Sequence, residues 1–192
     1  MKRYAPLWSS IAAISLFLGG CAAWRAPSQG VLCAERWGFE GRMAVALDHR
    51  GLNAGLRWHK HGSSFDLALW GPFGVGTVQL AGELSGPFTM TRGGQKRLYQ
   101  ALPEEVLWAE LGVWLPVSLL QYWVLGQKAP QWPGQWQHTP QGDVLQQAGF
   151  TVLVQARDAA LGLPQRLVVT GQEARLKLYI RQWLLPARCH GP

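Results

Sequence analysis

The stretch RLKLYIR, residues 175–181, carries the clearest secondary-structure signal of the chain. Its apolar residues Leu176, Leu178 and Ile180 alternate with charged or polar side chains. Because successive side chains of a β-strand point to opposite faces, this period of two predicts a strand with one apolar and one solvated face. Such strands are typical of antiparallel sheets in which only one face is covered.

The same period of two recurs through most of the sequence from Trp37 onward. Turn signals separate the alternating runs, among them residues 48–51 and the pair Gly93-Gly94, which predicts a hairpin. The alternating apolar positions are Met43, Val45 and Leu47; Ala54, Leu56 and Trp58; Phe65, Leu67 and Leu69; Val78 and Leu80; Phe88 and Met90; Phe150, Val152 and Val154; and Leu167 and Val169. The pattern predicts an antiparallel meander with a single apolar face.

The middle of the chain instead contains residues that typically begin and end helices. Pro103 opens one helical pattern, which Gly112 ends, and Pro116 opens a second, which Gly126 ends. A loop rich in Pro, Gln and Trp is expected from there to about Gln141. Because the apolar face of the sheet must be covered, we predict a strongly curved sheet capped by the helices, with an apolar cavity between the layers.

The composition excludes several protein classes. The chain has 192 residues, of which only 15% are charged, so one domain with a substantial core is expected and disorder is not. No apolar run after residue 20 approaches the roughly 18 residues of a membrane span, which excludes a polytopic membrane protein. Three cysteines are too few for a disulfide-dense miniprotein. The eleven tryptophans indicate large aromatic surfaces, in a core or around an apolar ligand.

The first twenty residues have the form of an export signal. A basic start at residues 1–3 precedes an apolar stretch at residues 11–18. The ending Leu18-Gly19-Gly20-Cys21 resembles the bacterial lipobox, which implies cleavage before Cys21 and lipidation of its thiol; the alternative is an ordinary signal with a chance cysteine. By analogy with bacterial lipoproteins, Ala22 implies sorting to the outer membrane. We therefore expect a signal peptide at 1–20, a lipidated tether at 21–36, the folded domain at 37–185 and a tail at 186–192.

The charge of the processed chain bears on its partners. Cleavage removes two basic residues and no acidic one, lowering the basic count from 18 to 16 against 11 acidic residues, a net charge of +5. A moderately basic, lipid-anchored domain suits an anionic lipid surface. An exported chain without a Lys/Arg cluster on a helical pattern is not expected to bind nucleic acid.

The sequence offers no catalytic constellation, metal site or cofactor motif. His59-Lys60-His61 places two histidines on one strand face without further ligands, so a solvated strand end is expected. The glycine-rich run at residues 71–76 is followed by a strand and not a helix, which argues against a phosphate loop. Cys33 and Cys189 could form a disulfide in an oxidising compartment, or could remain as two thiols. We expect no enzyme activity.

Several motifs, taken in order, resemble the family of the outer-membrane lipoprotein receptor LolB. They are Gly41-Arg42-Met43-Ala44-Val45, the strand containing Trp58, Gly71-Pro72-Phe73-Gly74, Leu111-Gly112-x-x-Leu115-Pro116-Val117-x-x-Leu120, Trp123-Val124-Leu125-Gly126 and Leu176-Lys177-Leu178-x-Ile180-x-x-Trp183. The resemblance runs from about Trp37 to Trp183. Residues 127–148 and the tail match the family poorly, and Phe73 stands where the family pattern leads us to expect Leu.

The resemblance implies an unclosed antiparallel β-barrel with a helical lid over an apolar cavity, in a monomer without a cofactor. It also implies that the protein accepts acylated lipoproteins from the periplasmic carrier LolA and inserts them into the outer membrane without nucleotide hydrolysis. The alternative is a lipoprotein that binds another lipid or a glycolipid on the same scaffold. A basic rim of Arg57, Lys60, Arg175, Lys177 and Arg181 could meet an acidic carrier face, or could be an ordinary solvated face.

Two sets of residues are the candidate site. The acyl-chain cavity is expected to be lined by the inward positions Val45, Leu56, Trp58, Leu67, Leu69, Val78, Leu80, Met90, Leu111, Leu120, Trp123, Val152, Val154, Leu167, Val169, Leu178 and Ile180, although a filled core would use the same side chains. Pro72, Phe73 and Gly74 form a loop in which Phe73 is expected either to enter the membrane, as the resemblance implies, or to fold back onto the sheet.

Overall fold

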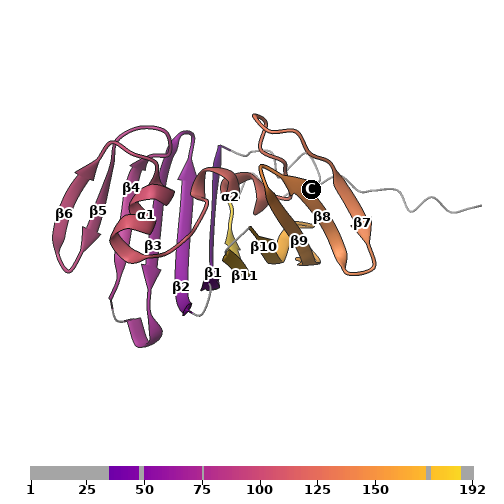
Figure 1. Ribbon diagram of the computed structural model, residues 1–192, viewed down its shortest axis with the longest axis horizontal. Helices are drawn as coiled ribbons and strands as arrows, with labels where there is room; N and C mark the ends of the chain where they lie inside the picture. Colours follow the sequence, from indigo (N-terminus) through magenta and orange to yellow (C-terminus); the bar gives the residue numbers. More distant parts are fainter. Residues whose placement is uncertain (1–34, 48–49, 75, 172–173, 187–192) are drawn as a thin grey trace, which may run out of the picture.

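One antiparallel sheet organises the described part of the chain, which comprises residues 35–47, 50–74, 76–171 and 174–186 of a computed structural model. Eleven strands in these residues follow the order β6-β5-β4-β3-β2-β1-β11-β10-β9-β8-β7 (Figure 1). Their bounds are β1 Arg36–Leu47, β2 Arg50–His61, β3 Ser64–Trp70, β4 Val78–Glu83, β5 Phe88–Arg92, β6 Gln95–Tyr99, β7 Trp136–Thr139, β8 Gly142–Gln147, β9 Phe150–Arg157, β10 Pro164–Thr170 and β11 Ala174–Leu184. Two meanders thus meet at the central pair of β1 and β11.

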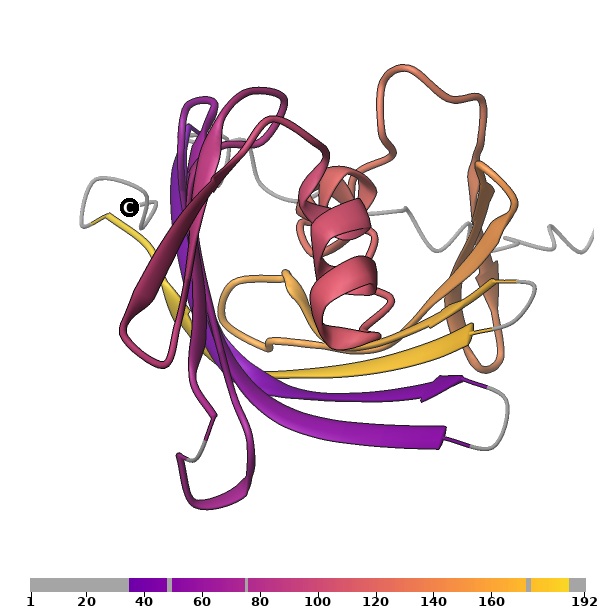
Figure 2. The same cartoon turned by 60° about the vertical axis from the view of Figure 1, so that its left-hand side comes forward.

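The sheet is strongly curved and does not close on itself. β6 and β7 are its two edges, and the strands wrap around the helices on the concave side (Figure 2). A β-bulge lies in the β1–β11 pairing between Glu40 and Gly41. A Cβ at Gly41 would lie 2.3 Å from the carbonyl oxygen of Tyr179, so the close strand approach at this bulge requires glycine.

Two short helices occupy the concave side of the sheet, as the sequence predicts. α1 spans Pro103–Leu111 and ends at Gly112, whose left-handed φ of 61° lets its N–H bond to the carbonyl oxygen of Trp108. α2 spans Val117–Trp123, shorter than the predicted segment, because the chain passes into turns before Gly126. The mainly β, unclosed architecture with helices on one face is confirmed.

The prediction of a loop after the second helix is wrong in part, because β7 lies within the predicted range. This edge strand is largely exposed and polar, so its sequence lacks the apolar alternation by which a strand is predicted. Side chains link β7 to the next two strands. Asp143 of β8 accepts a hydrogen bond from Arg157 of β9 at 2.9 Å and pairs with His138 of β7 at 2.9 Å. Burial tends to raise the pKa of Asp143, but the hydrogen bonds from His138 and Arg157 outweigh it and hold the pKa below its usual value.

No helix in the described ranges is long and apolar enough to span a bilayer.

Candidate functional site: an apolar interior and a projecting loop

The inward positions of the two sheet halves and the helices gather into one apolar cluster. Sixteen of the seventeen predicted cavity residues are buried, and the remaining one, Leu111, is partly buried against the same cluster. Leu56, Trp58 and Leu67 from the first half and Leu167 and Val169 from the second are each 0% exposed. The structure therefore brings the predicted set together on one side of the sheet.

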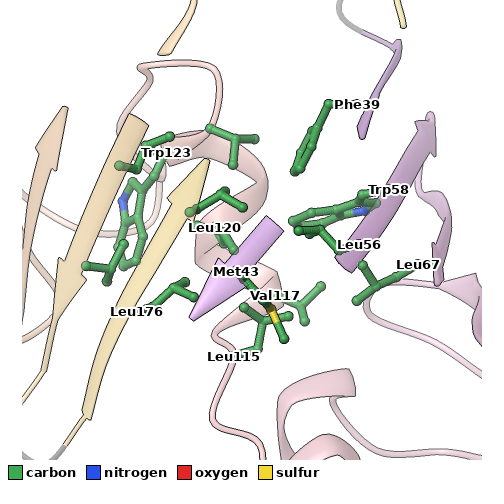
Figure 3. Packing of buried hydrophobic residues seen from close by; sticks show 14 of the residues in the cluster. Phe39, Met43, Leu56, Trp58, Leu67, Leu115, Val117, Leu120, Trp123 and Leu176 are labelled. Carbon is green, nitrogen blue, oxygen red and sulfur yellow. The ribbon is translucent and has the colours of Figure 1, made fainter. Parts of the chain in front are cut away.

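α2 supplies the opposite wall of this interior. Leu120 and Val117 face Met43, Leu56 and Trp58 across the centre of the molecule (Figure 3). The side chains of the helix fill the concave face in this state. An apolar ligand could lie between α2 and the sheet only if these side chains moved away from the sheet, which would exchange one set of apolar contacts for another.

A buried glutamine fixes the far end of α2. Gln147 Oε1 accepts hydrogen bonds from Trp123 Nε1 at 3.0 Å and from the Ala129 N–H at 2.8 Å. Its Nε2 donates to the carbonyl oxygens of Ala129 and Trp132. All four bonds are made by a side chain that is 3% exposed, so this end of the lid is tied to β8 and to the following loop. Sequence reasoning missed Gln147, which stands in a polar stretch without period.

An aromatic cluster closes the interior near the start of β1. The rings of Trp37 and Trp58 meet edge to face at 5.3 Å, and those of Phe39 and Trp183 at 5.4 Å. Trp37 and Phe39 were missing from the predicted lining, although they continue the alternation of Met43 and would have been found by extending it. Within the described residues, Nε1 of Trp58 and Nε1 of Trp183 are buried without a hydrogen-bond partner.

A hollow opens beside the helices. It has a volume of about 500 Å³ and is lined by Leu47, Trp108, Trp114 and Phe150, among others. The ring of Phe150 lies 5.2 Å from Trp114 and 5.6 Å from the buried Trp123. Aromatic contacts thus link the lining of this mouth to the interior beside α2.

The loop between β3 and β4 projects from the body of the molecule in both views (Figures 1 and 2). Phe73, in a 3₁₀ turn at Pro72–Gly74, is fully exposed and has a left-handed backbone with φ 59°. Gly74 N–H bonds to the Gly71 carbonyl at 3.1 Å, which holds the turn. In this structure Phe73 does not fold back onto the sheet.

Comparison with known proteins identifies the relatives of this architecture. The family model described as "Outer membrane lipoprotein LolB" matches residues 35–183. The chain belongs to the LolB family. Proteins named Outer-membrane lipoprotein LolB from Chromohalobacter salexigens and Cellvibrio japonicus are each 30% identical to it, over 94% and 96% of this chain and 91% and 98% of their own.

For this LolB-family chain, a solved structure supports the fold and nothing beyond the fold. A DUF1329 family protein from Desulfovibrio piger superimposes with a TM-score of 0.51 at 6% identity, covering 82% of this chain and 92% of that protein. The predicted family resemblance is thereby confirmed by sequence, and the predicted half-barrel by structure. Cys21, Cys33 and Cys189 lie outside the described residues, as does the tail apart from Pro186.

The basic rim expected from strand parity is wrong as a single cluster. Lys60 has the inward parity of Trp58 and is partly buried, and its ammonium donates to the Gly62 carbonyl; burial lowers its pKa. Arg57 and Arg181 instead converge on Glu40, at 2.6 and 3.5 Å. Only part of the rim therefore stays together, on the outer face of the sheet.

Proposed function

We propose that this LolB-family chain is anchored in the outer membrane through Cys21, accepts acylated lipoproteins from a soluble carrier of the LolA type and inserts them into that membrane. The acyl chains would bind between the concave sheet face and α2. The observation that carries the proposal is the apolar interior covered by two short helices, with a mouth lined by aromatic rings beside them and a projecting aromatic loop.

The chemistry of the interior suits hydrocarbon chains. Each buried CH₂ group is worth about 0.8 kcal/mol, so the chains of one lipoprotein represent a gross burial on the order of tens of kcal/mol. This gain would offset the cost of moving helix side chains away from the sheet. The partnerless indole N–H groups of Trp58 and Trp183 would donate to the carbonyl oxygens that join the acyl chains to the cargo.

Transfer from the carrier would need no nucleotide. Each tenfold preference of the receptor over the carrier takes only about 1.4 kcal/mol, which a modest difference in apolar contacts supplies. Release then requires contact with lipid. Phe73, held outside the fold by Pro72–Gly74, would enter the bilayer and bring the mouth of the site to the membrane surface.

The proposal is tested by a handover experiment. Residues 22–192, which contain every described strand and helix, are mixed without nucleotide with a LolA-type carrier that holds a triacylated lipoprotein. The two proteins are separated and the cargo is located. We expect the cargo on this chain, and we expect Phe73→Glu to accept it equally well but to deliver it more slowly to vesicles.

Retention of the cargo on a carrier from the same organism would refute the receptor role. Mass spectrometry of lipids bound to the purified chain would then identify another lipid or a glycolipid as its ligand. Normal delivery by Phe73→Glu would refute the membrane role of the loop while leaving the acceptor role intact.

A further inference from the structure

The outer face of the sheet is hollowed beside the Phe73 loop. The hollow has a volume of about 730 Å³, and Phe73 itself lies on its rim with Arg42, Trp70, Lys177 and Tyr179. This face is opposite to the one covered by the helices (Figure 2). The hollow therefore adjoins the projecting loop without being part of the acyl-chain interior.

The aromatic part of the hollow is built by close packing. A Cβ at Gly55 would lie 2.2 Å from Trp70 Nε1, so the indole lies directly over the backbone of β2 at the base of the loop. Tyr179 is 40% exposed nearby, and the Arg166 guanidinium lies 6.0 Å from its ring centre. A partly buried indole beside an exposed phenol suits the interface between water and lipid.

The basic part follows from the strand register. Arg42 is paired with Tyr179, and Ala44 with Lys177, which puts both cations on the outer face at the centre of the sheet. Arg175 lies two residues before Lys177 on the same face and is exposed. Within the described residues, none of these three cations belongs to an ion pair.

Farther along the same face the charge is compensated. The Glu40 carboxylate forms ion pairs with Arg57, at 2.6 Å, and with Arg181, at 3.5 Å. Among the described residues, the cations without an ion-pair partner therefore lie toward the end of the face that adjoins the loop, and the paired ones lie toward the other end. A surface with this gradient presents its basic end to an anionic partner when the loop leads.

We propose that this hollow, with Arg42 and Lys177 as its cations, binds the head groups of anionic phospholipids when Phe73 enters the bilayer. The inference rests on the proposed function. An apolar group that reaches roughly 5–10 Å into the head-group boundary leaves the phosphates beside the base of the loop. Because Phe73 and the two cations line one hollow, phosphates at the base of the loop would lie beside both charges, where salt screens the attraction only in part.

The test measures binding of residues 22–192 to vesicles of phosphatidylcholine alone and of phosphatidylcholine mixed with phosphatidylglycerol. Each cation near an anionic surface strengthens binding about fivefold, so Arg42→Gln with Lys177→Gln should weaken binding to the mixed vesicles on the order of 20-fold. Binding to phosphatidylcholine alone should not change. The matched control, Arg57→Gln with Arg181→Gln, also removes two positive charges from this face and should weaken binding much less.

Equal losses in both double variants would overturn the proposal, because net charge and not the hollow would then govern binding. No loss in the Arg42 and Lys177 variant would overturn it as well. A variant that binds vesicles normally but no longer takes cargo from the carrier would assign the hollow to an acidic carrier face instead. Failure of the wild-type chain to take cargo, with the vesicle pattern intact, would refute the receptor role and not the lipid site.

Discussion

Phe73 is the residue whose replacement separates stability from function most cleanly. Its side chain is fully exposed, and its backbone has φ 59°. A left-handed backbone costs a non-glycine residue about 1–2 kcal/mol. The folded domain therefore bears this cost and gains no apolar burial from the ring.

Phe73→Gly should consequently leave the fold at least as stable as the wild type. Glycine removes a backbone strain of about 1–2 kcal/mol from the folded state. Its greater freedom in the unfolded chain lowers the stability by about 0.5–1 kcal/mol. We expect the free energy of unfolding to rise by about 0–1.5 kcal/mol, measured by urea denaturation with the m value unchanged.

The same substitution should weaken delivery to the membrane. Burial of a phenylalanine side chain contributes about 1.5–3 kcal/mol, so its loss should weaken vesicle binding about 10- to 150-fold. Phe73→Leu keeps an apolar tip and should retain most of the delivery rate. A clear loss of stability in Phe73→Gly, or unchanged cargo delivery by it, would refute this reasoning.

Three further substitutions test the supports of the site. Gln147→Leu should lower the free energy of unfolding by about 3 kcal/mol in urea denaturation, because the indole N–H of Trp123 and the backbone groups that Gln147 now pairs with would stay buried without partners. A change under about 1 kcal/mol would contradict a stabilising role of these hydrogen bonds. Asp143→Asn should cost about 1 kcal/mol at neutral pH through its pair with Arg157, and titrated unfolding should show the deficit shrinking as pH falls through the lowered folded pKa, since the wild type then loses the pair too; a deficit independent of pH would exclude the ion pair as its cause. Gly55→Ala should lower the thermal midpoint, because its Cβ would lie 2.2 Å from the overlying indole; an unchanged midpoint would show that the indole shifts freely.

Alternation decided most of what the sequence could predict. Strands with one buried face, such as β11, carry a period of two that is unambiguous. The same parity placed nearly all of the predicted lining on one side, and glycine and proline marked both helices. Curvature and the position of the helices on the concave face followed from the need to cover that side.

The missed features lack such a period. β7 is an exposed edge strand without an apolar face, and Gln147 is a polar residue whose burial depends on partners far away in sequence. The predicted basic rim was wrong for another reason. Lys60 shares the inward parity of Trp58, and the sequence could not show that Arg57 and Arg181 both pair with Glu40. Long-range pairs of charges are set by register, which the sequence does not reveal.

The most direct test of the central claim is to map where the acyl chains lie. The chain is loaded by the carrier with a lipoprotein whose acyl chains bear a photoreactive diazirine, irradiated and digested, and the adducts are located by mass spectrometry. We predict adducts at inward positions such as Leu178, Ile180 and Leu120. Adducts confined to outward neighbours such as Lys177, Tyr179 and Val168 would contradict an acyl-chain site between the sheet and the helices.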